Sequence, residues 1–343
     1  MPSELSLDLQ IVHEALPAYD IGKEIGRGGG GVVLSATHRH LGRRVAIKQL
    51  PRAFSSDEAV RDRFYEEARL AASLDHPHIV PVYDYVEHGG VCLIVMELMT
   101  HGSLWARHHR EGLMPDEACG VVLAVLSALE YAHSKLCVHR DVKPDNVLFG
   151  PGGVVKLSDF GIAKVLGGGG GRTMSGEVVG TPAYMAPEQA SGEAVGPGTD
   201  VYATGVVLYE LLAGRLPFPA TSSPVQQLYQ HVHEQPAPLL EVAPSVSPVV
   251  AEVVMRSIAK DPAERYGRAE TFGVALARAA AEAFGPRWVH HCGVELLTSA
   301  EIAEAAVWQP TGAQPRVAPP APDQASTGAP SGTPAAPPGA GAD

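Results

Sequence analysis

The 343-residue chain is 45% hydrophobic and 19% charged, which is ordinary for a folded protein, and it is long enough to form two lobes or domains. It carries 26 Lys and Arg against 38 Asp and Glu, a net charge of −12, and this balance disfavours a nucleic-acid binder, which normally has a basic excess. No two of its four cysteines form a C-x-x-C pair, so neither a zinc site nor a disulfide framework is indicated. We therefore expect a cytoplasmic chain without a signal peptide and without the roughly 20-residue apolar run that a membrane helix needs.

The first predicted elements are three short strands between Tyr19 and Leu50. The turn after the first strand is rich in glycine and matches G-x-G-x-x-G-x-V at Gly26, Gly28, Gly31 and Val33. Glycines let a backbone approach phosphate oxygens closely, although such a run is more often only a flexible hairpin turn. A strand pattern follows and not a helix, which argues against a dinucleotide-binding fold.

The third strand, RRVAIKQL, places Lys48 between apolar neighbours, where a lone lysine is usually solvated. Ser55-x-x-Glu58 then predicts the start of a helix, and apolar residues at helical spacing continue it to Leu74. Glu67 borders the inward face of this helix, and Glu66 is the competing position. A second strand pair is predicted at 79–86 and 91–98, followed by a long helix over 115–136.

The stretch from Val138 to Gly161 carries the strongest chemical signal. Two short apolar runs, 147–149 and 154–157, are broken at Pro151-Gly152-Gly153, which predicts a tight hairpin. The hairpin would bring the two loops at its ends side by side. Two carboxylates, an ammonium and a carboxamide then converge, contributed by Asp141, Asp159, Lys143 and Asn146. This set suits a divalent metal on polyphosphate next to a hydroxyl.

The remaining chain is predicted to be helical up to an unstructured tail. The segment 200–212 is apolar on nearly every side and ends at Gly214, so we expect it in the middle of a lobe. Weaker amphipathic helices follow at 225–233, 246–258 and 268–284. The amphipathic stretch 288–308 is either a helix packed on the lobe or a docking segment. From about Gln309 the composition turns to Pro, Ala, Gly and Ser, which predicts disorder.

Taken in order, these motifs resemble the eukaryotic-like, bacterial-type Ser/Thr protein kinases over roughly residues 17–280. The resemblance is carried by the glycine turn, V-A-I-K, the helix with its glutamate, H-R-D-V-K-P-D-N, D-F-G, G-T-P-A-Y-M-A-P-E, Asp200 and D-P-A-E-R. It implies an α+β bilobal kinase fold, with a β-rich N-lobe containing one helix at about 17–99 and a mainly helical C-lobe at about 100–285. Residues 1–16 would be an N-terminal extension, 286–308 an appended segment and 309–343 a disordered tail.

The resemblance also implies roles for individual residues, with ATP and Mg²⁺ (or Mn²⁺) as cofactors. Asp141 would orient the acceptor hydroxyl, Lys143 would lie by the γ-phosphate, and Lys48, held by Glu67, would contact the α- and β-phosphates. Asn146 and Asp159 would bind the metal. The nucleotide pocket would be formed by Gly26, Gly28, Gly31, Val33, Ala46, Lys48, Met96, Glu97, Met99, Asn146 and Asp159, with Met96 at its back and 97–99 as the interlobe hinge.

Two further pairs would be structural: His139 packed near Phe160, and Glu188 paired with Arg265. Regulation is expected in the activation segment, where Arg140 would receive a phosphate carried by Thr173 or Ser175. Thr173 ranks first, and Thr181 would instead bond toward Asp141 and Lys143.

The expected function is an ATP-dependent Ser/Thr protein kinase acting on Ser and Thr hydroxyls of proteins, including a second copy of itself in a possible homodimer. A small-molecule phosphotransferase is the first alternative, and P-A-Y-M-A-P-E argues against it because that segment docks peptides. A nucleotide-binding pseudokinase scaffold is the second, disfavoured because all the catalytic positions are filled. Many relatives carry a membrane span after a Pro-rich linker, so a longer protein stays open.

Overall fold

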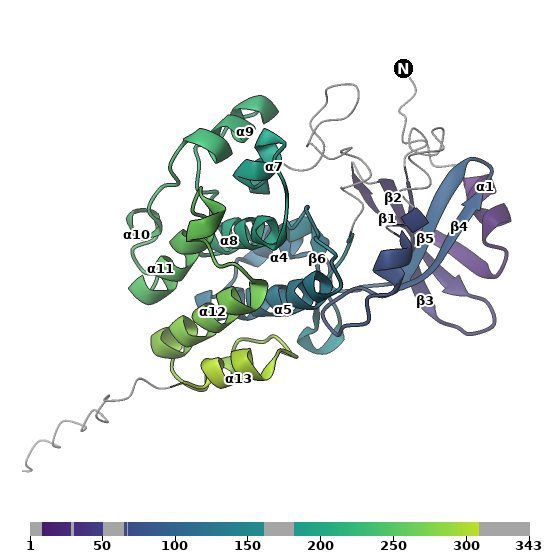
Figure 1. The fold of residues 1–343 in the computed structure, drawn as a ribbon. Helices are drawn as coiled ribbons and strands as arrows, with labels where there is room; N and C mark the ends of the chain where they lie inside the picture. The colour runs from purple at the N-terminus through teal and green to yellow at the C-terminus, as the bar shows by residue number, and fades with distance from the viewer. Residues whose placement is uncertain (1–8, 29–30, 51–64, 67, 161–181, 309–343) are drawn as a thin grey trace, which may run out of the picture. The chain divides into compact units, whose positions relative to one another are not determined.

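Five antiparallel strands form the N-lobe sheet in the computed structural model, which describes residues 9–28, 31–50, 65–66, 68–160 and 182–308 (Figure 1). The strands are β1 (Tyr19–Gly28), β2 (Gly31–His38), β3 (Arg44–Gln49), β4 (Val82–His88) and β5 (Val91–Glu97), in the order β1-β2-β3-β5-β4. The three strands predicted before Leu50 are therefore confirmed. β3 and β5 are the most buried strands because β3 has a neighbour on each side and both carry apolar runs.

Two boundaries in the N-lobe differ from expectation. The strand predicted from Ile79 begins at Val82, because Ile79 instead forms a parallel bridge with Leu157 in the C-lobe. The short helix α1 (Leu9–Ala15) lies within the predicted N-terminal extension and buries Val12 against the sheet. The predicted helix start at Ser55 lies outside the described residues, but residues 68–72 are helical as expected.

The C-lobe is built around two helices that are buried on almost every side, α5 (Pro115–Ser134) and α8 (Pro197–Ala213). Every side chain from Ala118 to Leu129 in α5 is buried, and so is every side chain from Thr199 to Leu211 in α8. The predicted end of α8 is confirmed, since Gly214 closes it with a φ of 68°. α5 ends two residues before the predicted Leu136, whose φ of 60° is incompatible with a continuing helix.

The other C-lobe elements surround this pair (Figure 1). They are α4 (Leu104–Glu111), η1 (Pro144–Asn146), β6 (Val147–Phe149), η2 (Pro151–Gly153), β7 (Val155–Leu157), η3 (Pro182–Tyr184), α7 (Pro187–Ser191), α9 (Pro224–His233), α10 (Leu239–Val242), α11 (Pro248–Ser257), η4 (Pro262–Glu264), α12 (Ala269–Phe284), η5 (Trp288–His290) and α13 (Ala300–Ala306). The predicted hairpin is confirmed, because β6 and β7 pair antiparallel. None of the helices described is long and apolar enough to cross a membrane.

Residues 288–308 pack on the C-lobe, which decides between the two options that the sequence left open. Trp288, Cys292, Val294 and Ile302 belong to the same hydrophobic cluster as α5, α8 and α12. The segment is therefore part of the lobe's core.

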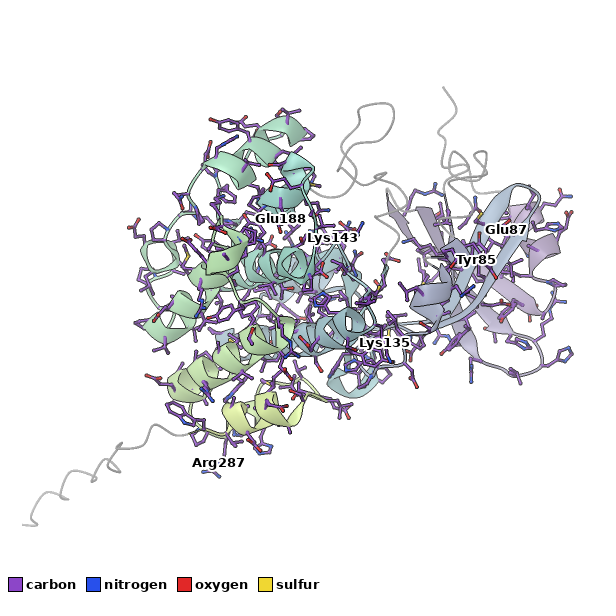
Figure 2. All side chains as sticks on the ribbon, in the orientation of Figure 1. Tyr85, Glu87, Lys135, Lys143, Glu188 and Arg287 are labelled. Carbon is purple, nitrogen blue, oxygen red and sulfur yellow. The ribbon has the colours of Figure 1, made fainter. Side chains whose placement is uncertain are left out.

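The predicted pair of Glu188 and Arg265 is confirmed as a buried, bidentate ion pair (Figure 2 labels Glu188). Both guanidinium NH groups donate to the carboxylate at 2.9 Å, and Thr199 donates a third hydrogen bond at the same distance. Burial alone would raise the pKa of Glu188, but Arg265 and Thr199 lower it below its ordinary value. The pair joins α7 to the start of α8 and to the loop after η4. Removing one partner would leave a buried charge, which typically costs about 3–5 kcal/mol.

A buried histidine gives a testable pH dependence. His231 in α9 shares a hydrogen bond of 2.8 Å with the Tyr202 hydroxyl, and burial together with the nearby Lys260 ammonium lowers its pKa from 6.5 to about 3. The folded protein therefore keeps His231 neutral while the unfolded chain takes up a proton below about pH 6.5. Stability should fall as the pH drops from 6.5 toward 3, by about 2 kcal/mol between pH 7 and pH 5 from this residue.

The substitution His231→Gln should remove that part of the acid sensitivity, measured by urea unfolding at both pH values. The matched control is His233→Gln, because His233 is exposed on the same helix. An equal loss of stability at pH 5 in the wild type and His231→Gln would show that His231 is not the titrating group. His76, whose pKa burial lowers to about 4, should account for part of the slope that remains.

Candidate active site

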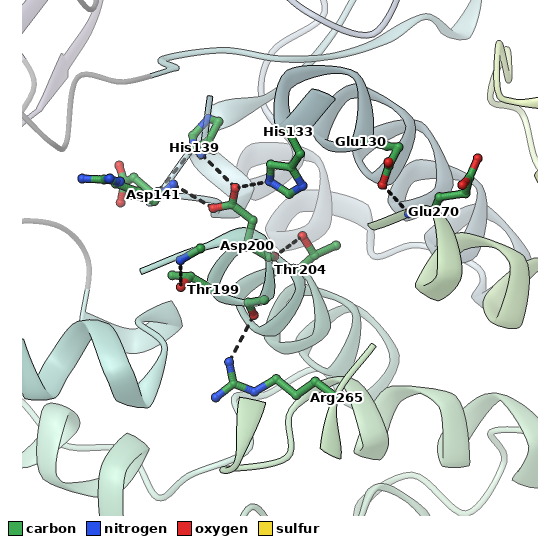
Figure 3. A network of polar contacts seen from close by, with 12 residues as sticks. Glu130, His133, His139, Asp141, Thr199, Asp200, Thr204, Arg265 and Glu270 are labelled. Carbon is green, nitrogen blue, oxygen red and sulfur yellow. Dashed lines mark hydrogen bonds and ion pairs between the residues drawn. The ribbon is translucent and has the colours of Figure 1, made fainter. Parts of the chain in front are cut away.

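A buried carboxylate shapes the first loop of the site. Asp200, at the start of α8, accepts the backbone N–H of His139 at 2.8 Å on one oxygen and that of Arg140 at 2.7 Å on the other (Figure 3). His133 of α5 donates from Nε2 to the same carboxylate at 2.8 Å. Burial would raise the pKa of Asp200, but these hydrogen bonds and the neighbouring histidines lower it, so the group stays ionised. Arg140 has a φ of 69°, a costly backbone conformation that Asp200 therefore maintains.

His139 connects this loop to the loop that follows β7. Its Nδ1 atom accepts from the Asp141 backbone N–H at 3.2 Å, so Nε2 carries the proton and donates to the Ser158 carbonyl at 2.8 Å. The ring packs edge-on against Phe160, with ring centroids 4.6 Å apart, as the sequence predicted. A fully buried imidazole thus fixes the spacing between Asp141 and the residue before Asp159.

Asp141, Lys143 and Asn146 converge at the end of the first loop. The Lys143 ammonium lies 2.7 Å from the Asp141 carboxylate, and Figure 2 places Lys143 in the helical part of the chain. The Asn146 amide nitrogen donates to the Asp141 carbonyl at 2.8 Å and to its carboxylate at 3.2 Å. Since the nitrogen makes these bonds, the amide oxygen is the atom through which Asn146 would bind a metal.

Lys48 and Asp159 form the second part of the site. The Lys48 ammonium, buried on β3, lies 2.8 Å from the Asp159 carboxylate. Burial would raise the pKa of Asp159, but the charge and hydrogen bond of Lys48 lower it below its ordinary value. Asp159 has a φ of 65°, so its position depends on the strand before it.

The glutamate expected to hold Lys48 is not settled by the structure. Glu67 lies outside the described residues. Glu66, the competing position, has a side chain that is 65% exposed and lies 3.7 Å from Arg69, so it does not contact Lys48. The partner that Lys48 does have is Asp159, a pairing that the sequence analysis did not foresee.

The residues expected around the nucleotide lie on neighbouring strands. Ala46 of β3 pairs with Met96 of β5, and both are buried in one apolar cluster that Val33 borders. Gly28 pairs with Gly31 across the glycine turn. Gly31 has a φ of 118°, and a Cβ atom there would lie 2.0 Å from the Gln49 carbonyl oxygen, so only glycine fits.

Two contributors to this region were missed at the sequence level. Leu148 of β6 packs in the same apolar cluster as Ala46 and Met96, although it belongs to the other lobe. Lys156 of β7 donates to the carboxylate of Glu97 at 2.6 Å, which ties the predicted hinge to the C-lobe. The only local signal for Lys156 is its place between apolar residues on a short strand, where it must face away from the core.

Asn146 and Asp159 fit a magnesium ion better than a structural zinc. They offer an amide oxygen and an ionised carboxylate, which are the hard ligands that Mg²⁺ uses together with substrate phosphates. No cluster of three or more His, Cys, Asp or Glu that could hold a metal occurs among the described residues. A metal here would therefore need phosphate oxygens to complete its shell.

The predicted regulatory residues are only partly within view. Thr173, Ser175 and Thr181 lie outside the described residues. Arg140 is described: its carbonyl accepts from Gln189 at 2.9 Å, and its buried Nε atom has no hydrogen-bond partner within the described ranges, which omit 161–181.

Comparison with known proteins agrees with this geometry. The model of the family described as "Protein kinase domain" matches residues 19–276. A probable serine/threonine-protein kinase of Streptomyces coelicolor, SCO3848, is 41% identical over 262 residues, which cover 75% of this chain and 39% of that protein. Serine/threonine-protein kinase PknA of Mycobacterium tuberculosis is 40% identical over 275 residues, 78% of this chain and 63% of PknA.

A solved structure is also similar. The crystal structure of the PknI kinase domain of Mycobacterium tuberculosis matches with a TM-score of 0.61 and 29% identity, covering 77% of this chain and 96% of that domain. The chain thus spans 39–63% of the length of the relatives named above and nearly all of a kinase domain. With the sheet, the two tied loops and these matches in agreement, the chain belongs to the protein kinase family, among its eukaryotic-like bacterial Ser/Thr members.

Proposed function

We propose that this chain is an ATP-dependent Ser/Thr protein kinase that transfers the γ-phosphate of ATP, with Mg²⁺ or Mn²⁺, to Ser and Thr hydroxyls of proteins. The observation that carries the proposal is the convergence of Asp141, Lys143 and Asn146 on one loop with Lys48 and Asp159 on the other side. Acidic and basic groups at this spacing serve phosphoryl transfer, where positioning and charge stabilisation supply most of the acceleration.

The roles follow from charge and contact. Asp141 orients the acceptor hydroxyl and takes its proton as the new O–P bond forms and the bond to the β-phosphate oxygen breaks. Lys143, which already holds the Asp141 carboxylate at 2.7 Å, neutralises charge on the transferring phosphoryl group. Lys48 binds the α- and β-phosphates. Asn146 and Asp159 would hold the divalent metal, which supplies charge neutralisation between the β- and γ-phosphates.

A protein acceptor is favoured over a small molecule by the anchoring of residues 182–191. Tyr184 of η3 donates to the buried carboxylate of Glu210 at 2.7 Å, and His231 makes a hydrogen bond with the Ala183 backbone. α7 follows and is held by the Glu188–Arg265 pair. A fixed loop beside the catalytic aspartate is suited to docking an extended peptide. Because ATP is a cytoplasmic substrate, the proposed reaction belongs in the cytoplasm.

The direct test is mass spectrometry of the purified chain, alone and with a generic protein substrate, after incubation with ATP and Mg²⁺. We expect phosphate on Ser and Thr residues, and none when the metal is chelated. Phosphate found only on tyrosine, or ATP consumed without any phosphorylated protein, would contradict the proposal.

The first prediction concerns Asp141. The substitution Asp141→Asn should lower kcat by about 10²-fold or more, because the carboxylate acts mainly in the transition state. The dissociation constant of ATP should hardly change. The matched control is Asp145→Asn, since Asp145 is exposed four residues further on and is assigned no role. A near wild-type rate for Asp141→Asn would mean that another group orients the acceptor.

The second prediction concerns activation by phosphorylation in trans, which may involve a homodimer only transiently. A phosphate adds a charge of about −1.5 to −2 and forms charge-assisted hydrogen bonds with arginine. The buried Nε atom of Arg140, which lacks a partner within the described ranges, suits that role. The double substitution Thr173→Ala with Ser175→Ala should therefore keep the enzyme at low activity.

The assay compares phosphatase-treated protein before and after preincubation with ATP. The wild type should gain activity and the double variant should not, whereas Thr173→Ala alone should lose most of the gain. Equal activity in every sample would show that the enzyme is constitutive.

A further inference from the structure

The chain continues past the last residue of the family match, Phe284 being the end of α12, and returns along the C-lobe as a segment that we name the C-terminal strap, residues 286–308. Trp288 closes the strap on itself by donating from Nε1 to the Ala306 carbonyl at 3.1 Å. Ser127 of α5 donates to the Leu297 carbonyl at 3.2 Å. α13 lies against α12 in Figure 1.

Two glycines inside helices show that the lobe is built to receive the strap. A Cβ atom on Gly120 of α5 would lie 2.9 Å from the Cys292 sulfur, and one on Gly273 of α12 would lie 2.7 Å from Cδ1 of Ile302. Glycine inside a helix is destabilising relative to alanine, so its presence needs a compensating reason. Close packing against the strap supplies that reason at both positions.

The strap reaches the active site through His78, a buried residue with no assigned role. The Leu297 backbone N–H can only donate, so Nε2 of His78 accepts from it at 2.9 Å. Nδ1 must then carry the proton and donate to the Val155 carbonyl at 2.7 Å. Burial lowers the pKa of His78, which favours this neutral form. Both ring nitrogens are used, and only 1% of the residue is exposed.

The same contacts continue directly into the strand that leads to Asp159. The Leu157 N–H donates to the His78 carbonyl at 2.9 Å, and the Val80 N–H donates to the Leu157 carbonyl at 3.0 Å. At the other end of β7, the strap's Glu295 N–H donates to the Gly153 carbonyl at 3.2 Å. β7 is thus held near both of its ends, and Asp159 follows two residues after it.

We propose that the C-terminal strap is a positioning element of the active site, which acts through His78 and Gly153 to hold β7 so that Asp159 stays where a metal ion would bind. The proposal rests on the proposed function for the role of Asp159. The competing view is that the strap only covers apolar surface of α5 and α12, in which case breaking its polar contacts would leave the metal site unchanged.

The test removes single backbone donors from the strap of the full chain. Leu297→Pro deletes the N–H that His78 accepts, and the Leu297 side chain is 47% exposed, so little packing is lost. Leu297→Ala is the matched control because it keeps the N–H. Glu295→Pro and Glu295→Ala form a second, independent pair at the other end of β7, which keeps the test valid if one proline variant folds poorly.

Two readouts separate positioning from simple stability. The first is hydrogen exchange of the Leu157 and Val80 amides. The second is binding of Mn²⁺, followed by electron paramagnetic resonance, with a non-hydrolysable ATP analogue. We expect both proline variants to lose protection at these amides and to bind Mn²⁺ about fivefold more weakly or worse, the effect of one hydrogen bond, while both alanine controls match the wild type.

Unchanged amide protection and unchanged Mn²⁺ binding in the proline variants would overturn the proposal, even if their melting temperatures fell. Loss of protection with unchanged Mn²⁺ binding would also overturn it, because β7 would then move without affecting the metal site. A wild type that binds no Mn²⁺ with the analogue would contradict the proposed function itself and the role of Asp159 with it. Loss of amide protection in the proline variants would still, in that case, show that the strap is coupled to β7.

Discussion

The carboxylate of Asp200 is the group on which the geometry of the catalytic loop depends. It is buried, ionised and fully used, with two backbone N–H donors from the loop and an imidazole donor from α5. Hydrogen bonds to a buried charge are stronger than those between neutral groups, and removing the acceptor would leave two backbone donors unsatisfied. The left-handed backbone at Arg140 is held against its own conformational preference in this way. The direction of the Asp141 side chain follows from that backbone.

The constraint is passed from one loop to the other by His139 and the β6–β7 hairpin. His139 binds the backbone of Asp141 with one nitrogen and the carbonyl of Ser158 with the other. The hairpin fixes the same two loops at their far ends, so the catalytic aspartate and the predicted metal ligand cannot shift independently. Lys48 then joins the N-lobe sheet to this assembly through Asp159. The site is therefore held by a few buried polar contacts between elements that are themselves rigid.

The sequence predicted the local elements and the identity of the site residues well, because both depend on short-range patterns. The glycine turn, the hairpin at Pro151 and the apolar helix ending at Gly214 each follow from residues within a few positions of one another. The missing parts are long-range pairs. Asp200 lies 61 residues from His139, Glu97 lies 59 from Lys156, and His78 lies 219 from Leu297. Each of these residues is an ordinary polar side chain in its own neighbourhood, so no periodicity announces its partner.

The all-round burial of α5 changes how its sequence can encode its register. An ordinary amphipathic helix is oriented by polarity, since turning it exposes apolar residues. α5 has no polar face over most of its length, so its rotation is specified by side-chain volume and by isolated hydrogen-bonding groups. Gly120 and Ser127 stand two helical turns apart and both face the strap, one giving room to Cys292 and the other donating to Leu297. One inserted residue between them would turn Ser127 by about 100° away from its acceptor while leaving the hydrophobicity profile almost unchanged. Insertions and deletions in this helix should thus be far more disruptive than hydropathy suggests.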